Sequence, residues 1–158
     1  MTLSEIREQA ITPAFQLLPA RMKSVEAELM LLAIGLQESR FKHRRQIGGP
    51  ARGFWQFERG GGVAGVIQHP VSREHALKVC GARNVRPIPD QVYQRLETDD
   101  VLAAAFARLL LWTDPARLPK VGDSAGAWDL YLRIWRPGKP HPDTWGDLYA
   151  KAAQCLTS

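Results

Sequence analysis

Residues 31–57 read LLAIGLQESRFKHRRQIGGPARGFWQF, and the rest of the chain is best interpreted outward from this stretch. It continues an apolar run that starts at Leu29, reaches a carboxylate at Glu38, and then enters a basic loop and a segment rich in glycine and aromatic residues. A run that is apolar on every side predicts a helix buried in the centre of the domain. Glu38 falls in the last turn of this predicted helix.

An acid is an unusual residue for the position of Glu38. A carboxylate in the last turn of a helix faces the negative end of the macrodipole, which costs about 0.3–1 kcal/mol. Burial beside Phe41 or Trp55 would disfavour the charged form further, so both effects raise the pKa of the carboxyl group. A carboxylic acid that stays protonated near neutral pH is the general acid that cleavage of a glycosidic bond requires. The alternative is a solvated carboxylate with no chemical role.

Glu38-Ser39, followed by the turn GFWQF at 53–57, resembles the lysozyme-like superfamily, most closely its soluble lytic transglycosylases and goose-type lysozymes. In that family a Glu-Ser pair ends a buried helix, and a Gly-aliphatic-Met-Gln-aliphatic turn follows after a loop. The resemblance extends over residues 24–138. It implies a lysozyme-like fold in which Glu38 is the catalytic acid.

The same resemblance implies substrate-side roles for several other residues. Ser39 would position the acid or a substrate group, although a serine at a helix end is often only a local cap. Gln56 would contact the sugar, and Gly53 would serve backbone conformation rather than chemistry. Trp55, which stands where the family carries methionine, and Trp135 are the tryptophans expected against sugar rings.

Tyr131 is a candidate partner of the acid. Transglycosylases of this type carry a tyrosine, in an Ala-Tyr-Asn-x-Gly context, that forms a hydrogen bond near the acid. Tyr131 ends the segment AWDLY at 127–131, but Leu132 stands where the asparagine would be. The alternative is a core aromatic side chain whose hydroxyl finds another partner.

Glu58 decides between two mechanisms. It lies just beyond Gln56, where some lysozymes place a second carboxylate. If it faces Glu38 across a cleft at roughly 6.5–9.5 Å, it could activate a water molecule and make the protein an inverting hydrolase. If it points to solvent, the resemblance implies a lytic transglycosylase, in which Glu38 protonates the glycosidic oxygen and then helps the muramic acid 6-hydroxyl close a 1,6-anhydro ring. A glutamate at a helix start is also commonly only a dipole partner.

The composition is that of one globular domain with an excess of positive charge. The chain has 158 residues, of which 45% are hydrophobic, which suits a single core and argues against disorder. Its net charge of +5 favours an anionic partner, such as nucleic acid, an envelope surface or peptidoglycan with its peptide carboxylates. The basic run KHRR at 42–45, with Arg40 and Arg52 nearby, is either a solvated loop or a site that captures such carboxylates.

No metal or other cofactor is expected. The four histidines show no ligand spacing, and Cys80 and Cys155 are far apart and expected to be reduced. The glycines at 60–62 follow no predicted strand and precede no Gly-Lys-Ser or Gly-Lys-Thr, so a flexible cleft rim is favoured over a phosphate loop. Residues 1–15 lack the basic start and apolar run of a signal peptide, and no window predicts membrane insertion.

Helical periodicity and capping signals predict a mainly α single domain over residues 1–158, with at most a small β-hairpin. The helix over 98–112 is expected to pack against the helix that carries Glu38. The predicted helices are one opened by a capping box at Thr2, then 12–18, Ser24 to about Glu38, 72–79 closed by Gly81, 92–96, 98–112, 123–135, and one from a cap at Asp143 to Leu156.

Together, residues and resemblance predict a bacteriolytic peptidoglycan-degrading muralysin that cleaves the β-1,4 bond between N-acetylmuramic acid and N-acetylglucosamine. We expect a monomer of phage or prophage origin, made in the cytoplasm without a leader, that acts on cell-wall glycan strands in the periplasm as an endolysin or is carried in a virion. Nucleic acid is not an expected partner. Two alternatives stay open. A basic nucleic-acid-binding module predicts salt-sensitive DNA binding that is independent of Glu38. An inactive lysozyme-like protein predicts glycan binding without turnover.

Overall fold

The central element of the fold is α3, Val25–Ser39. The computed structural model describes residues 1–158. Ser24 caps α3 as predicted, since its Oγ accepts a hydrogen bond from the N–H of Ala27 at 3.0 Å. The helix is buried through most of its length, and it ends where Arg40 takes a left-handed backbone conformation with φ 56°.

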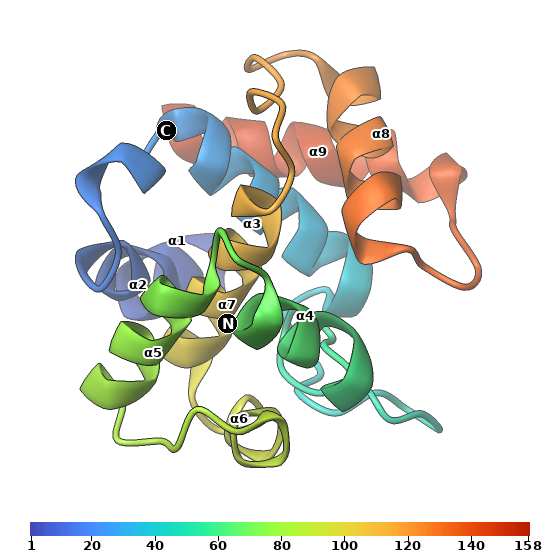
Figure 1. The fold of residues 1–158 in the computed structure, drawn as a ribbon. Coiled ribbons are helices and arrows are strands. Elements are labelled where there is room, and N and C mark those ends of the chain that lie inside the picture. Colours follow the sequence, from blue (N-terminus) through green and yellow to red (C-terminus); the bar gives the residue numbers. More distant parts are fainter.

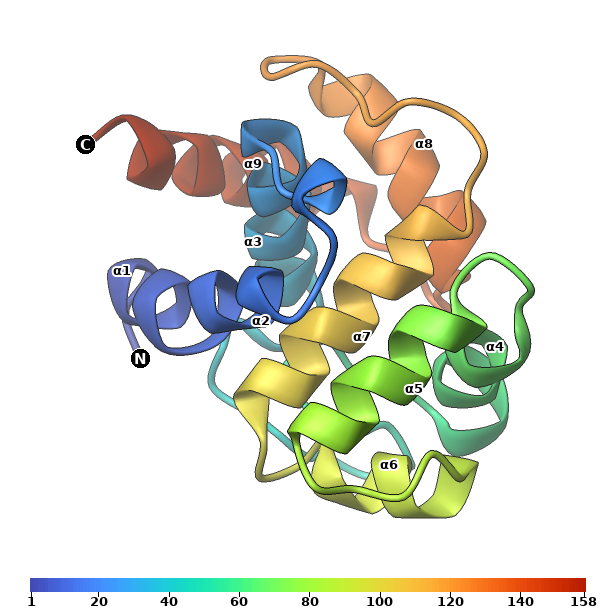
Figure 2. The same cartoon turned by 60° about the vertical axis from the view of Figure 1, so that its left-hand side comes forward.

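Two long helices pack against α3. α7, Asp100–Trp112, contacts α3 as predicted and also contacts α5, Arg73–Ala82. α9, Pro142–Thr157, lies along α3 and forms its most extensive contact (Figure 1). Figure 2 shows α7 crossing the molecule between α3 and α5. α3 and α7, the two most apolar of the long helices, therefore form the centre of the core, and α9 and the shorter helices cover them.

The N-terminal segment forms one continuous helical stretch where the sequence predicts two helices. α1, Leu3–Ile6, leads through a π-helical turn, η1, Arg7–Ile11, into α2, Thr12–Gln16. The predicted capping box at Thr2 is present. The π-helical turn η1 comes just before Pro13, which has no N–H to donate. Because a π-helical turn is wider than an α-helical turn, the helix continues from α1 into α2 without a break.

The remaining elements are a 3-10 turn, η2, Ala20–Met22; a second π-helical turn, η3, Arg59–Val63; and the helices α4, Ala64–Gln68, α6, Pro89–Arg95, and α8, Ser124–Trp135. α8 lies within the predicted range, and its N-cap is Asp123. The predicted closure of α5 by Gly81 is wrong, because Gly81 lies inside the helix.

Two helix starts also differ from the prediction. α6 begins at Pro89, before the predicted 92–96, and α9 begins at Pro142 rather than after a cap at Asp143. In both helices proline occupies the first turn, where its missing N–H costs nothing because that group has no partner within the helix.

The predicted fold class is confirmed, because the chain is mainly helical and has no β-sheet. The loop after α3 forms only isolated β-bridges, between Arg45 and Arg52 and between Arg52 and Phe57. Cys80 is buried, Cys155 is partly exposed, and neither forms a disulfide, as predicted. None of the helices combines the length and the apolar character that crossing a membrane would require.

Candidate active site

Glu38 lies in the last turn of α3 and is held by a residue far away in the sequence. The hydroxyl of Tyr131, on α8, donates a hydrogen bond to Oε1 of Glu38 at 2.7 Å. This is the contact that the resemblance implies for Tyr131. The two side chains come together because α3 and α8 both pack against α9.

The surroundings of Glu38 favour its neutral form. Burial raises the pKa of Glu38 to about 7 from an ordinary value of 4.5, and the hydrogen bond from Tyr131 opposes part of this rise. Burial also raises the pKa of Tyr131, and the nearby Glu38 raises it further, so its hydroxyl stays a donor. At neutral pH, Glu38 can therefore exist both as an acid and as a base.

Ser39 fixes the end of α3 to the turn that follows. Its hydroxyl is buried and donates a hydrogen bond to the carbonyl oxygen of Phe54 at 2.7 Å, and the carbonyl oxygen of Gly35 lies within donating distance at 3.2 Å. The hydroxyl oxygen accepts a hydrogen bond from the N–H of Phe41 at 3.1 Å. All of its hydrogen bonds are to backbone groups of the chain. Ser39 therefore ties the end of α3 to the turn at 53–57, and a role in positioning Glu38 or a substrate group stays a prediction.

Gly35 and Phe41 form a close contact that the sequence does not reveal directly. Phe41 has a left-handed backbone, φ 53°, which folds its ring back onto α3. A Cβ atom at Gly35 would overlap that ring, so only glycine leaves room for it. A lone glycine inside an apolar helix was the signal that could have indicated this close approach.

The turn at 53–57 has a backbone that explains two of its residues. Gly53 has φ +77°, and a Cβ there would lie 3.0 Å from the carbonyl oxygen of Leu96, which agrees with a conformational role for Gly53. Gln56 also has a positive φ, 55°, and its amide nitrogen donates to the carbonyl of Gly53 at 3.0 Å. Gln56 is half-buried, and its contact with sugar stays a prediction.

The prediction that Trp55 lies against a sugar ring is wrong. Trp55 is only 1% exposed, and its Nε1 donates to the carbonyl of Leu31 in α3 at 2.8 Å. Its ring packs edge-on against Phe41 at 5.5 Å, which makes it part of the core. Sequence alone could not show that Trp55 is buried, because its burial depends on Phe41 folding back onto α3.

Tyr131 belongs to a cluster of aromatic rings on α8 and α9. Its ring stacks on Trp145 with centroids 5.4 Å apart and an interplanar angle of 13°, and Trp128 also lies 5.4 Å away. Trp145 is itself fixed by a hydrogen bond from Nε1 to the carbonyl of Ser124. The ring of Tyr131 therefore has little freedom, and its hydroxyl stays directed at Glu38.

A pocket of about 460 Å³ opens between the turn at 53–57, the glycine run and the end of α8, and the ring of Trp135 in its wall lies 6.4 Å from that of Tyr131. Gln56, Glu58 and Trp135 line it. Trp135 is half-buried and is fixed by a hydrogen bond from Nε1 to the carbonyl of Trp55 at 3.0 Å. Its position in a pocket wall suits the expected sugar contact, which stays a prediction.

Glu58 lies in the wall of this pocket but is not among the groups that contact Glu38. It precedes η3, it is exposed, and it forms no ion pair. Glu38 itself does not line the 460 Å³ pocket. Of the two acids, only Glu38 therefore has the partly buried environment of a general acid, and the role of Glu58 stays a prediction.

The basic loop is largely neutralised by acids from the start of α7 and the residues before it. Arg44 donates two hydrogen bonds to Asp100, at 2.9 and 2.8 Å, and lies over the ring of Phe54. Arg45 and Arg52 both pair with Glu97. Of the run at 42–45, only Lys42 and His43 keep side chains without an ion pair, so the loop does not form a cluster of free cations. Arg40, next to the run, donates to the carbonyls of Leu36 and Gln37 at the end of α3.

No group of three or more His, Cys, Asp or Glu side chains comes together in a way that could hold a metal ion. Comparisons with protein-family models, with curated proteins and with solved structures found no significant match to this chain. The lysozyme-like resemblance therefore rests on the residues of the site alone.

Proposed function

We propose that this protein cleaves the β-1,4 glycosidic bond between N-acetylmuramic acid and N-acetylglucosamine in peptidoglycan, with Glu38 as the general acid. One observation carries the proposal: a partly buried carboxyl group at a helix end, with a pKa of about 7, is held by the buried hydroxyl of Tyr131. Such a group can donate a proton at neutral pH and accept one back.

The hydrogen bond from Tyr131 defines how the acid is presented. In a protonated carboxyl group the carbonyl oxygen is the better acceptor, and Oε1 of Glu38 accepts the bond from Tyr131. The proton of the neutral acid is therefore held at Oε2. Oε2 would donate it to the glycosidic oxygen while the bond from that oxygen to C1 of muramic acid breaks.

In the second step the same residue acts as a base. The Glu38 carboxylate takes the proton of the muramic acid 6-hydroxyl, and that oxygen forms a bond to C1 and closes a 1,6-anhydro ring. The acid is thereby regenerated, so one carboxyl group is sufficient for the cycle. This pathway is favoured because it needs no second carboxylate, and the hydrogen-bond partner of Glu38 is Tyr131 rather than Glu58.

Hydrolysis is the second candidate, because Glu58 lies in the wall of the 460 Å³ pocket. A carboxylate that faces this pocket could activate a water molecule, which would attack C1 in place of the 6-hydroxyl. The product would then carry a reducing end.

Mass spectrometry of fragments released from purified sacculi distinguishes these outcomes. The wild type is expected to release fragments with anhydro ends, and Glu38→Gln is expected to lower their release about 10²- to 10⁴-fold. Glu58→Gln is the matched control and should keep full release if Glu38 acts alone. Reducing ends that are lost in Glu58→Gln would support hydrolysis, and unchanged release by Glu38→Gln would overturn the proposal.

The setting of this activity follows from the resemblance. We infer an endolysin or a virion component of a phage or prophage that reaches peptidoglycan in the periplasm and acts without a cofactor.

A further inference from the structure

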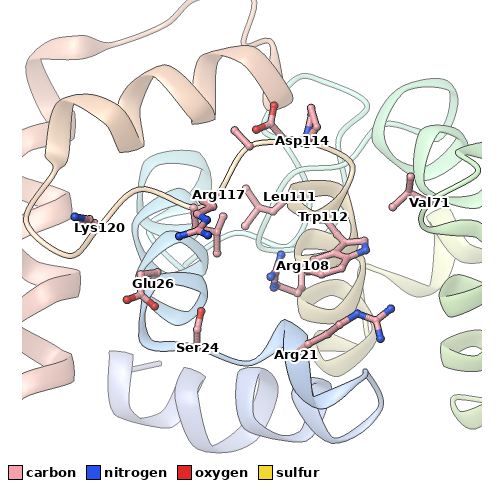
Figure 3. Close-up of a pocket in the computed structure, with 13 residues that line it drawn as sticks. Arg21, Ser24, Glu26, Val71, Arg108, Leu111, Trp112, Asp114, Arg117 and Lys120 are labelled. Atoms are coloured by element: carbon pink, nitrogen blue, oxygen red, sulfur yellow. The ribbon is translucent and has the colours of Figure 1, made fainter.

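A second and larger pocket, of about 670 Å³, opens at the other end of α3. It lies between the first turn of α3, the last turns of α7 and the loop that follows α7 (Figure 3). Ser24 and Glu38 are separated by most of the length of α3, about 20 Å at 1.5 Å per residue. The two pockets have no lining residue in common. The 670 Å³ pocket is therefore separate from the proposed active site.

The wall of this pocket contains a buried charge that lacks a partner. Arg108 of α7 is only 3% exposed, and the one hydrogen bond of its guanidinium group runs from Nε to the carbonyl of Met22 at 2.8 Å. Its Nη1 is buried without a hydrogen-bond partner, and no carboxylate pairs with it. Burial lowers the pKa of Arg108 to about 10, so the group stays charged at neutral pH. The chain supplies a buried cation without supplying its anion.

Other positive charges gather around Arg108. The guanidinium groups of Arg21 and Arg108 lie over the same indole ring, that of Trp112, at 5.6 and 5.3 Å. Figure 3 shows Arg21, Arg108 and Trp112 together on one side of the pocket, while Lys120 lies on its far side and Arg117 between them, so the wall carries two further cations. Neither guanidinium group is paired with a carboxylate of the chain, so their positive charges repel each other without compensation.

The carboxylates of the pocket do not neutralise these cations. Asp114 already accepts two hydrogen bonds from Arg133, at 2.9 and 3.1 Å, and Arg133 does not line the pocket. Glu26 forms no ion pair and is the only other acid in the wall. The first turn of α3 adds its own positive potential, because the first N–H groups of a helix have no partner within it.

We propose that this pocket binds a phosphate group, with Arg108 and Arg21 as its principal ligands and the first turn of α3 beside it. A phosphate monoester carries about two negative charges at neutral pH, which matches the excess of cations over carboxylates in the wall. Guanidinium groups bind phosphate oxygens in pairs, so a rotation of the Arg108 side chain toward the phosphate would satisfy Nη1, which is closed to solvent. Leu111, Leu118 and Trp112 line the remaining volume, which has the size of an organic ligand site.

Isothermal titration calorimetry at low ionic strength, with phenyl phosphate as the probe, tests this proposal. The wild type is expected to bind, and Arg108→Met is expected to bind at least tenfold more weakly. Arg86→Gln removes an exposed arginine outside the pocket, so it is the charge-matched control and should bind like the wild type. Absence of binding to the wild type, or equal loss in Arg86→Gln, would overturn the proposal.

A second variant tests the proposal even if Arg108→Met does not fold. Arg21 is exposed, so Arg21→Gln should fold normally and still bind phenyl phosphate several-fold more weakly than the wild type. Undiminished binding in both variants would contradict the assigned ligands.

Two further probes identify the source of the phosphate. Equal affinity for inorganic phosphate would assign the site to free phosphate, and tighter binding of phenyl phosphate would assign it to a soluble phosphate ester. Binding to vesicles that contain phosphatidic acid, lost in Arg108→Met, would assign it to a lipid headgroup.

Discussion

Charged groups that oppose the dipole of α3 lie at both ends of this helix, and the two ends differ in how the unfavourable interaction can be relieved. At the C-terminal end Glu38 places a carboxyl group at the negative pole, and at the N-terminal end Arg108 and Arg21 line a pocket at the positive pole. Glu38 can relieve the mismatch by keeping its proton, because its pKa is about 7. A guanidinium group stays charged at neutral pH, so only an anion can relieve the mismatch there.

This difference distinguishes the two proposed sites, one at each end of α3. At the C-terminal end, Glu38 can take up a proton and act as a proton donor, so it needs no other molecule to remove its charge. At the N-terminal end, Arg108 and Arg21 keep their charge, so under the proposal another molecule supplies the anion that pairs with them. The predictions below test each half of this comparison.

The largest effect on stability is expected for Glu38→Gln, as a function of pH. The folded pKa of Glu38 lies above its ordinary value of 4.5, so the folded state binds more protons than the unfolded state between about pH 4.5 and 7. The free energy of unfolding of the wild type therefore falls as pH rises through this interval. The variant lacks this loss and is expected to be more stable than the wild type at pH 8 by up to about 3 kcal/mol.

Urea unfolding of both proteins at pH 4 and pH 8 measures this difference. Glu26→Gln removes a carboxylate from the favourable end of the same helix, so it should gain no stability at pH 8. If the free energies of unfolding of wild type and Glu38→Gln change equally between pH 4 and pH 8, the pKa of Glu38 is not raised. The contrast between the two ends of α3 would then be contradicted at the C-terminal end.

A smaller effect is expected for Tyr131→Phe. Losing the bond to Glu38 should cost about 1–2 kcal/mol, since a partly buried carboxyl group loses its donor. The bond favours the charged form, so its removal raises the pKa of Glu38 further. The pH above which peptidoglycan release declines should therefore move upward.

Tyr149→Phe provides the matched control for this pH profile. Its hydroxyl accepts a hydrogen bond from the N–H of Gly122 at 2.9 Å in the same aromatic cluster. The variant should lose similar stability without moving the alkaline limb of the profile. If the alkaline limb of the pH profile shifts in both variants, loosening of the aromatic cluster causes the shift, and loss of the hydrogen bond to Glu38 does not.

Ser24→Ala tests the N-terminal end of the helix alone. It removes the cap on the N–H of Ala27 and should lower the free energy of unfolding by about 1 kcal/mol. Added phosphate should offset part of this loss, because an anion at the first turn interacts with the same free N–H groups. Thermal melts with and without phosphate measure the offset, and its absence would place the anion away from the first turn.

The smallest effect is expected for Arg108→Met without ligand. The variant loses the bond to the carbonyl of Met22 but also removes an unpartnered buried charge, so stability should change by no more than about 1 kcal/mol. Phosphate should raise the melting temperature of the wild type and leave that of the variant unchanged. A loss of several kcal/mol in the variant would indicate that Arg108 serves the fold rather than a ligand.

The sequence predicted those features that depend on local pattern. Apolar spacing located α7, and the capping residues Thr2 and Ser24 located two helix starts. It could not give the bond between Tyr131 and Glu38, which joins residues 93 positions apart and was reached only through the resemblance. Trp55 was misjudged because its burial depends on Phe41 folding back under α3.

Arg108 was missed although the sequence contained a signal. It is the only charged residue between Val101 and Trp112, in a helix that is otherwise apolar. A lone arginine in such a run is either exposed at a helix edge or buried with a purpose, and spacing alone does not separate the two. The burial and the missing partner become visible only once α7 is packed against Met22.

The contact between Gly35 and Phe41 has a consequence for finding relatives of this protein. A side chain at position 35 fits only if the ring at position 41 becomes smaller or moves, so the two positions are expected to vary together. A distant relative with alanine at the first position should carry a small residue at the second. This linked pair, combined with the glutamate and serine at 38 and 39, defines a search pattern that stays informative where overall sequence identity is too low to be detected.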